Sequence, residues 1–166
     1  MTDALLALGS NLGNRRELVD EAVARLGRRP GIHLTARSSY FKTAPVGPVD
    51  QEWFLNIAVA LTTELTPEAL LAECHAIEET LGRNRAAEIR WGPRFIDIDL
   101  IAFGEVTRSG PGLNLPHPRF AERGFVLIPL AEIAPDFRIG GRTVTEHLAK
   151  VDTSGVERLD WPVPEL

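Results

Sequence analysis

Two periods of apolar residues divide the chain into predicted helices and strands. Residues 14–27 have helical spacing, with Asn14 as an N-cap and a glutamate three residues later. Residues 66–81 open with a threonine cap and a first-turn proline, and their pattern stops at Gly82. Both segments are therefore predicted to be α-helices.

Four shorter segments have the composition or the alternation of β-strands. They are residues 4–8, 32–42, 53–62 and 95–103. Two further helices are predicted towards the C-terminus, at residues 123–133 and 143–150. The order of the first six elements predicts an α+β protein, with a ferredoxin-like βαββαβ sheet and a C-terminal helical extension.

Length and composition bound this prediction without changing it. A chain of 166 residues with 44% hydrophobic and 25% charged residues is typical of one globular domain. We expect residues 1–166 to form a single domain, in which the polar, proline-bearing residues 152–166 are a peripheral tail. The N-terminal stretch has no basic signal-peptide region and no apolar run of membrane-spanning length, so a cytoplasmic protein without membrane association is expected.

The net charge of −5 argues against nucleic-acid partners, because phosphate neutralisation requires clustered lysines and arginines. The arginines are nevertheless concentrated in one segment. It contains Arg83, Arg85, Arg90 and Arg94. A small anionic ligand fits such a segment better than a polymer does.

A pair of carboxylates follows this basic segment within a predicted strand. Because side chains alternate across a strand, Asp97 and Asp99 share one face, about 7 Å apart, and Ile98 points to the other. Two like charges in a half-buried sheet need a cationic partner. Mg²⁺ is a suitable one, since it is typically held by one or two carboxylates together with substrate phosphates. An isolated Asp-x-Asp is otherwise often only the solvated face of an edge strand.

Arginines and carboxylates together predict a clamp for phosphoryl groups. Arg94 precedes the strand, where its guanidinium can form two parallel bonds to phosphate oxygens, and residues 82–92 are a candidate lid. The alternative for these arginines is solvated surface. On the preceding helix, Glu78 lies at the border of the apolar stripe, a position that suits a salt bridge as well as a ligand, and His75 lies further round.

The predicted strand 53–62 has one apolar face and one mixed face. On the mixed face, Phe54 offers a stacking surface and Asn56 a paired donor and acceptor. Such a face suits a flat heterocycle, although an ordinary core position explains both residues equally well. Trp91 and Phe125 are candidates to complete a ring sandwich.

Two other motifs have weaker implications. The stretch LPHPRFAERGF brings His117 and Arg123 to one loop, where either can reach a phosphate. The stretch GSNLGN follows a predicted strand but lacks the phosphate-loop and dinucleotide-binding patterns, so it is predicted to be a turn and a helix cap. No nucleophile set of the serine–histidine–aspartate or cysteine–histidine type is evident, and the single cysteine, Cys74, is predicted to be a packing residue.

Taken in order, these motifs resemble those of a known family. The stretches ALGSNLGN, TAPVGPVDQEWFLN, GRNR, RWGPRFIDIDL and LPHPRFAERGFVLIPLAEIAP resemble the 6-hydroxymethyl-7,8-dihydropterin pyrophosphokinases of folate biosynthesis. The resemblance extends over about residues 4–135. It implies a ferredoxin-like α+β fold and transfer of the β,γ-pyrophosphoryl group of ATP to the hydroxymethyl group of the pterin, with release of AMP.

The resemblance also implies roles for individual residues. Asp97 and Asp99 are expected to bind two Mg²⁺ ions that bridge the phosphates of ATP, the co-substrate. The implied catalytic residues are Arg83, Arg85, Arg94, Asp97 and Asp99, with Arg85 in a mobile loop. The residues expected on the nucleotide side are His75, Glu78, Arg83, Arg94, Ile98, His117 and Arg123. The residues expected around the pterin are Thr43, Ala44, Val46, Phe54, Asn56, Trp91 and Phe125.

Phosphoryl transfer depends mainly on positioning and charge neutralisation, which metal ions and arginines supply. Asp99 is one candidate for the proton acceptor, but a metal-bound carboxylate is a poor base, so the general base stays open. Two alternatives also stay open. One is a Mg²⁺-dependent transferase with another heterocyclic acceptor, and the other is a catalytically silent ferredoxin-like binding domain. A monomer that binds only small-molecule substrates is expected.

Overall fold

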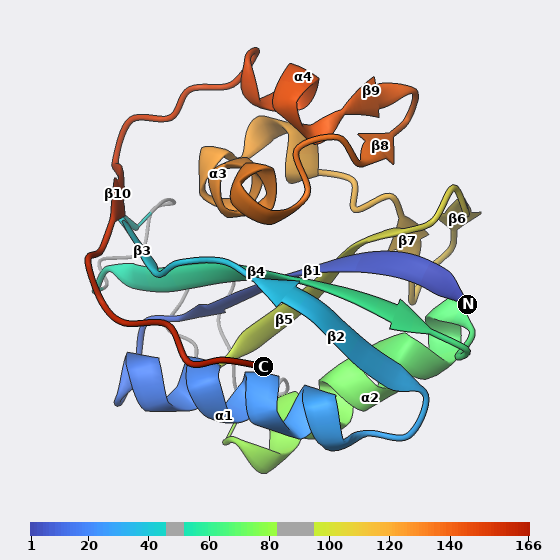
Figure 1. The fold of residues 1–166 in the computed structure, drawn as a ribbon, viewed down its shortest axis with the longest axis horizontal. Helices are drawn as coiled ribbons and strands as arrows, with labels where there is room; N and C mark the ends of the chain where they lie inside the picture. The colour runs from blue at the N-terminus through green and yellow to red at the C-terminus, as the bar shows by residue number, and fades with distance from the viewer. Residues whose placement is uncertain (46–51, 83–94) are drawn as a thin grey trace.

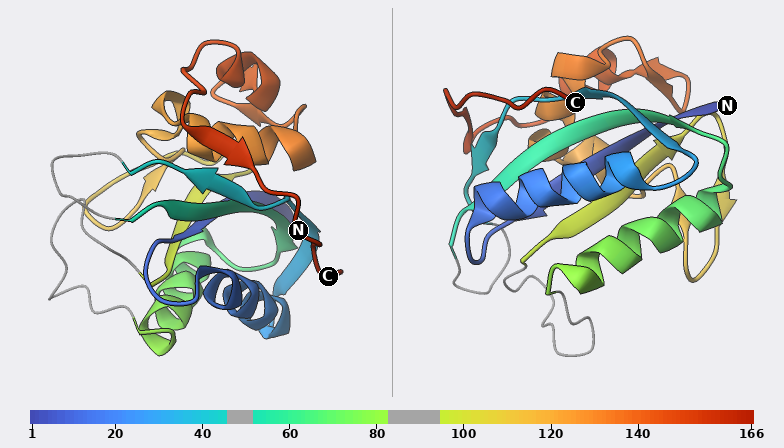
Figure 2. Two further views of the ribbon diagram at one scale, coloured as in Figure 1. Left: turned by 90° about the vertical axis from the view of Figure 1, so that its left-hand side faces the viewer. Right: turned by 60° about the horizontal axis from the view of Figure 1, so that its bottom comes forward.

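The computed structural model of the chain describes residues 1–45, 52–82 and 95–166. These residues form three layers, with one antiparallel sheet between two sets of helices (Figures 1 and 2). On one face lie α1 (Arg15–Arg28) and α2 (Pro67–Thr80). On the other face lies α3 (Gly124–Ile133), with the short α4 (Val144–Leu148) beside it.

The main sheet has the strand order β10-β3-β4-β1-β5, and β2 also pairs with β4. Its strands are β1 (Thr2–Ser10), β2 (Ile32–Arg37), β3 (Phe41–Thr43), β4 (Phe54–Thr63), β5 (Asp97–Phe103) and β10 (Val156–Arg158). Every pairing between them is antiparallel. The predicted α+β class is therefore confirmed, and the sheet is antiparallel.

Three small elements supplement the sheet and the helices. They are the ribbon of β6 (Arg108–Ser109) and β7 (Asn114–Leu115), the ribbon of β8 (Arg138–Ile139) and β9 (Arg142–Thr143), and the 3-10 helix η1 (Phe120–Glu122). Strand β7 and the start of η1 flank His117, in a stretch that the sequence analysis assigned to a loop. No helix of the described ranges is long and apolar enough to cross a membrane.

Each face of the sheet has its own hydrophobic cluster. Leu55, Ile57, Val59 and Leu61 of β4 point towards α1 and α2, and Ala58 of the same strand packs against α3. The two faces that alternation predicts for this strand are thus confirmed. The mixed face of β4 is the one that α3 covers.

The predicted helix starts are confirmed by their caps. The Asn14 side-chain oxygen accepts the backbone N–H of Glu17 at 3.2 Å, and the Thr66 hydroxyl accepts that of Ala69 at 3.1 Å. Helix α2 ends beside Gly82, whose φ of +102° is a left-handed conformation that favours glycine. These local signals fix where the two helices begin.

The prediction of one strand over residues 32–42 is wrong, because the structure divides this segment into β2 and β3. One extra residue enters between the pairs Arg37–Val59 and Phe41–Asn56. At this bulge the hydroxyl of Ser38 accepts the backbone N–H of Ala58 at 2.8 Å. A side chain thus takes the place of a main-chain acceptor, and the ladder is interrupted.

The C-terminal residues 152–166 contact the body of the protein more closely than a peripheral tail would. Strand β10 pairs with β3 and extends the sheet at that edge (Figure 1). Leu159 and Trp161 pack against the hydrophobic cluster between the sheet and helices α1 and α2. The sequence gives no sign of this strand, because three residues are too few to display an alternation.

Candidate active site

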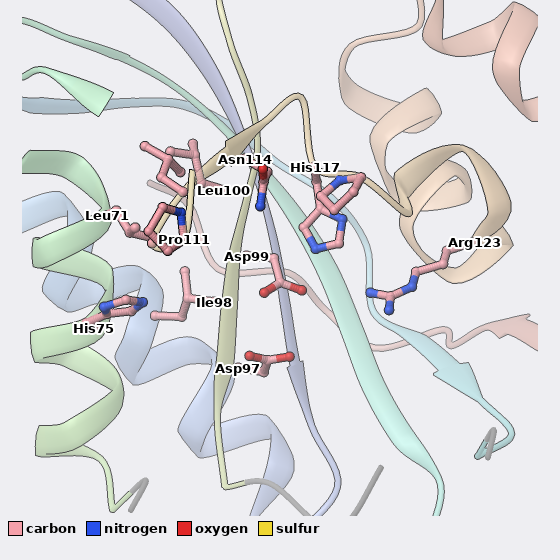
Figure 3. Close-up of a pocket in the computed structure, with 13 residues that line it drawn as sticks. Leu71, His75, Asp97, Ile98, Asp99, Leu100, Pro111, Asn114, His117 and Arg123 are labelled. Carbon is pink, nitrogen blue, oxygen red and sulfur yellow. The ribbon is translucent and has the colours of Figure 1, made fainter. Parts of the chain in front are cut away.

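The two aspartates lie on the α3 face of β5. Asp97 and Asp99 are half-buried, whereas Ile98 and Leu100 are buried in the opposite cluster with α1 and α2. Figure 3 shows both carboxylates on the same side of the strand, turned towards the side from which His117 and Arg123 approach. The alternation predicted for this strand is therefore observed.

Glu78 supports the strand between these aspartates. It is completely buried, and its Oε2 accepts the backbone N–H of Ile98 at 2.8 Å. Strand β5 is the last in the strand order of the main sheet, so N–H groups on its outer edge have no neighbouring strand to pair with. The carboxylate of α2 supplies the missing acceptor. Glu78 does not line the cavity described below, so its described contact supports the strand rather than a ligand.

His117 lies opposite the aspartates, in the loop between β7 and η1. Its Nδ1 accepts the backbone N–H of Arg119 at 3.2 Å, so the neutral ring carries its proton on Nε2. Burial lowers the pKa of the imidazole from its ordinary value, and the charge of Arg123 lowers this pKa further, against an opposing effect of Asp97. We therefore expect His117 to be neutral and to donate a hydrogen bond from Nε2.

Arg123 immediately precedes α3 and directs its guanidinium towards the aspartates (Figure 3). The guanidinium carbon lies 5.7 Å from the centre of the Phe125 ring. This contact links a predicted nucleotide residue to a predicted pterin residue. One turn of chain therefore places a cation and an aromatic ring next to each other.

A cavity of about 390 Å³ extends from the aspartates between α2 and the β6–β7 region. It brings together four of the residues expected on the nucleotide side, His75, Ile98, His117 and Arg123, and both predicted metal ligands, Asp97 and Asp99. The other lining residues are Leu71, Leu100, Pro111, Gly112, Leu113, Asn114 and Pro118. The wall formed by residues 111–114 was missed by the sequence analysis, because this loop reaches the site only through the tertiary fold.

The donor set of the site suits Mg²⁺. Two half-buried carboxylates face the same cavity, with a cation and a neutral histidine opposite. Within the described ranges, no group of three or more histidine, cysteine, aspartate or glutamate side chains is placed to hold an ion alone. Mg²⁺ is commonly bound by one or two carboxylates plus phosphate oxygens and water, so Asp97 and Asp99 fit that requirement.

Asn56, the predicted polar partner of the pterin, is nearly buried on β4. Its Nδ2 donates to the hydroxyl of Thr43 at 2.8 Å. The side-chain oxygen Oδ1 is therefore the atom that can accept a hydrogen bond from a ligand. A Cβ added at Gly9 would lie 2.7 Å from that oxygen. Glycine is therefore required beside Asn56, a function that the sequence analysis did not assign to the GSNLGN stretch.

The sheet places Asn56 and Asp97 in one row. Gly9 pairs with Asn56 on one side and with Asp97 on the other. Two strand spacings separate these partners by about 10 Å. The side chains in this row belong to the face covered by α3, so the predicted acceptor and metal residues point to the same side of the sheet.

The remaining predicted residues are distributed as follows. Phe54 and Phe125 are half-buried, Thr43 is buried and Ala44 is exposed at the end of β3. None of these four lines the cavity beside the aspartates. The predicted residues Val46, Arg83, Arg85, Trp91 and Arg94, and most of the candidate lid 82–92, lie outside the described residues. Their roles stay predictions.

Paired carboxylates facing an arginine and a histidine across a cavity form an anion-binding site of the kind used by phosphoryl-transfer enzymes. The family described as 7,8-dihydro-6-hydroxymethylpterin-pyrophosphokinase (HPPK) matches residues 5–135 of this chain. The chain belongs to this family. It is accordingly a diphosphotransferase.

Relatives of the chain agree with this assignment over nearly its whole length. The 2-amino-4-hydroxy-6-hydroxymethyldihydropteridine pyrophosphokinase of Methylorubrum extorquens is 54% identical over 160 residues, which are 96% of this chain and 100% of the relative. The protein of the same name from Pseudomonas aeruginosa is 44% identical over 155 residues, 93% of this chain and 94% of the relative.

The fold also occurs in solved structures of lower sequence identity. The crystal structure of wild-type Plasmodium falciparum HPPK-DHPS with pteroate superimposes with a TM-score of 0.69 at 16% identity, covering 90% of this chain. A crystal structure of HPPK-DHPS in complex with substrates gives a TM-score of 0.67 at 13% identity, covering 89%. This chain spans less than half of those chains, 42% and 43% respectively, and the similarity shows the fold.

Proposed function

We propose that the protein transfers the β,γ-pyrophosphoryl group of ATP to the hydroxymethyl group of 6-hydroxymethyl-7,8-dihydropterin and releases AMP, as a step of folate biosynthesis. The observation that carries the proposal is the placement of Asp97 and Asp99 opposite His117 and Arg123 across one cavity. Membership of the HPPK family supports the choice of acceptor.

On the donor side, the residues of the cavity bind and orient the triphosphate. Asp97 and Asp99 hold Mg²⁺, in the two-ion form that the family resemblance implies; when bound, the metal neutralises phosphate charge and polarises the transferred group. Arg123 pairs with phosphate oxygens, and neutral His117 donates a hydrogen bond from Nε2. Arg83, Arg85 and Arg94 are predicted to complete the cationic clamp.

On the acceptor side, Asn56 orients the heterocycle. Because its Nδ2 is bonded to Thr43, its Oδ1 is the atom that accepts from a ring N–H or amino group of the pterin. Phe54 and Phe125 flank the ring in this proposal, and Ala44 offers backbone groups. The row through Gly9 then sets the distance from the heterocycle to the carboxylates.

The topology is proposed to be ferredoxin-like. If β2 and β3 are counted as one interrupted strand, the order of β5, β1, β4 and β2/β3 with antiparallel neighbours supports this assignment. The single catalytic domain, the cytoplasmic location and the monomeric state stay predictions.

The test is release of AMP from ATP and Mg²⁺, measured by chromatography with and without 6-hydroxymethyl-7,8-dihydropterin. Pterin-dependent AMP with equimolar pterin pyrophosphate is the expected result. AMP release with other flat heterocycles but not with this pterin would instead indicate a transferase with another acceptor. Saturable binding of pterin or nucleotide without any AMP would indicate a silent binding domain and would refute the proposal.

A further inference from the structure

The C-terminal segment that the sequence suggests is peripheral holds the edge of the acceptor side. We refer to residues 152–162 as the C-terminal strap; they lie beyond residues 5–135, which the family match covers. Within the strap, β10 pairs with all three residues of β3, from Phe41 to Thr43. Strand β3 is thus held between β4 on one side and the strap on the other.

One bond of the strap reaches beyond the paired strands. The backbone N–H of Ala44 donates to the carbonyl oxygen of Gly155 at 3.1 Å. Ala44 directly follows Thr43, whose hydroxyl accepts the amide of Asn56. The strap therefore fixes the backbone at the point where the chain leaves β3 on the proposed acceptor side.

Gly155 makes this bond from a conformation that favours glycine. Its φ is +79°, in the left-handed region, where a Cβ is strained. A Cβ built at this position would lie 3.6 Å from the Cβ of Ala44, an ordinary contact distance. A side chain at Gly155 therefore disturbs the backbone conformation rather than the packing.

The far end of the strap is anchored independently of β10. The backbone N–H of Leu159 donates to the carbonyl of Tyr40 at 2.8 Å, and the ring of Trp161 lies 5.4 Å from that of Tyr40. Arg16 of α1 donates to the carbonyl of Pro162 at 2.8 Å. Tyr40 is completely buried, so these contacts attach the strap to the core.

The strap also contacts the start of α3. A Cβ added at Gly124 would lie 2.6 Å from the carbonyl oxygen of Asp152, so the two backbones are in direct contact there. Gly124 lies between Arg123 and Phe125, both of which belong to the proposed site. Further along, Arg158 contacts Glu132 of α3 at 3.5 Å and Ser39 at 3.2 Å. One segment thus touches both β3 and α3.

We infer that the C-terminal strap sets the position of the acceptor side, and that Gly155 is a positioning residue acting through the backbone of Ala44. The inference rests on the proposed function for its substrate, the hydroxymethyldihydropterin. It predicts that loosening the strap at Gly155, where it bonds to Ala44, weakens pterin binding and leaves nucleotide binding unchanged, because neither Gly155 nor any residue of β3 lines the aspartate cavity.

The experiment compares three single variants of the full chain. Gly155→Ala introduces a side chain at a positive φ next to Ala44. Gly141→Ala does so at a φ of +84° in the β8–β9 turn, where nothing lies within 4 Å, and serves as the control for strain alone. Gly155→Asn is the conservative variant, since asparagine tolerates the left-handed region better than alanine.

The main measurement is KM for the pterin at saturating ATP and KM for ATP at saturating pterin. If the strain leaves about a third of the molecules with Ala44 correctly placed, the pterin KM of Gly155→Ala rises about threefold. We expect an unchanged KM for ATP, an unchanged pterin KM in Gly141→Ala and a partial return to the wild-type value in Gly155→Asn. Equal KM values in the two alanine variants would overturn the inference.

A second measurement does not depend on turnover. Amide hydrogen exchange at Ala44 is expected to accelerate in Gly155→Ala and to stay at the wild-type rate in Gly141→Ala. A wild-type protein that makes no AMP with the pterin would refute the proposed function, and the exchange rates would still test the strap. Unchanged exchange at Ala44 in Gly155→Ala would refute the positioning role of Gly155 whatever the activity.

Discussion

The carboxylate of Glu78 accepts the backbone N–H of Ile98 at 2.8 Å, at the residue between Asp97 and Asp99. Glu78 belongs to α2, on the face of the sheet opposite to that of the two aspartates. A residue of one layer thus holds the main chain that presents the proposed metal ligands to the other layer. Glu78 thus supports the backbone of β5, and it is not among the residues that line the cavity.

Replacing Glu78 by alanine is expected to lower the free energy of unfolding by about 2–4 kcal/mol, because a buried N–H loses its carboxyl acceptor and a void is left. The measurement is urea unfolding followed by circular dichroism. Glu79→Ala is the matched control, since the neighbouring side chain on α2 is exposed, and a change within about 0.5 kcal/mol is expected there. Equal losses in the two variants would show that the bond to Ile98 contributes nothing.

Asp97→Asn and Asp99→Asn are each expected to reduce AMP formation by at least about a hundredfold, because each removes charge that the metal requires. The fold should be retained, since asparagine has the same shape and one of two like charges is relieved. Turnover and thermal unfolding of the same samples provide the check. Asp136→Asn, an exposed position outside the site, should keep wild-type turnover. Near-normal turnover in both site variants would remove the argument for a metal.

Gly9→Ala is expected to raise the pterin KM about tenfold, since displacing Asn56 Oδ1 costs one well-placed hydrogen bond, on the order of 1–2 kcal/mol. The cause is the 2.7 Å approach between an added Cβ and that oxygen. The ATP KM should not change. A double-mutant cycle with Asn56→Ala tests the route: if Gly9→Ala acts only through Asn56, it adds little in the absence of the amide. If the effects of Gly9→Ala and Asn56→Ala on the pterin KM were fully additive, Gly9 would not act through Asn56.

Cys74 is expected to resist thiol reagents in the folded protein. Burial raises the pKa of this thiol to about 12, with further increases from the charges of Glu78 and Asp99. At pH 8 almost no reactive thiolate is present, and the side chain is enclosed in the core. Reaction with a chromogenic disulfide should be complete in urea and negligible without it. Rapid labelling of the native protein would contradict this.

The same thiol gives a pH dependence with a definite sign. The pKa of Cys74 is raised in the folded state, so its contribution to stability is complete below about pH 9, the unfolded value, and is lost as the pH rises towards about 12. Over this range the free energy of unfolding should fall more steeply in the wild type than in Cys74→Ala. Parallel curves for the two proteins would exclude this linkage.

The parts of the fold that the sequence predicts are those with local causes. Asn14 and Thr66 cap their helices through their own side chains, and the alternation along β4 and β5 determines which residues face α3. Asp97 and Asp99 were therefore placed on the correct face. Where one residue and its near neighbours determine the geometry, a single sequence is sufficient.

The parts that could not be predicted depend on distant partners. The division of β2 from β3 depends on the Ser38 hydroxyl, which bonds to Ala58 twenty residues away. Strand β10 is formed by contacts with β3, more than a hundred residues earlier in the chain. The cavity wall at residues 111–114 likewise has no signature of its own, because a loop becomes a wall only when the fold brings it to the site.

The row of Asn56, Gly9 and Asp97 crosses three strands that main-chain hydrogen bonds hold together. Its width is therefore set by the backbone and not by any side chain. A related chain could exchange most of its core residues and still inherit the same gap between amide and carboxylate. Inserting or deleting one residue within β1 would instead change its register against both neighbours and turn the residues of β1 beyond the change to the opposite face. The side chains of the core can therefore change during evolution, whereas the register of β1 against β4 and β5 cannot.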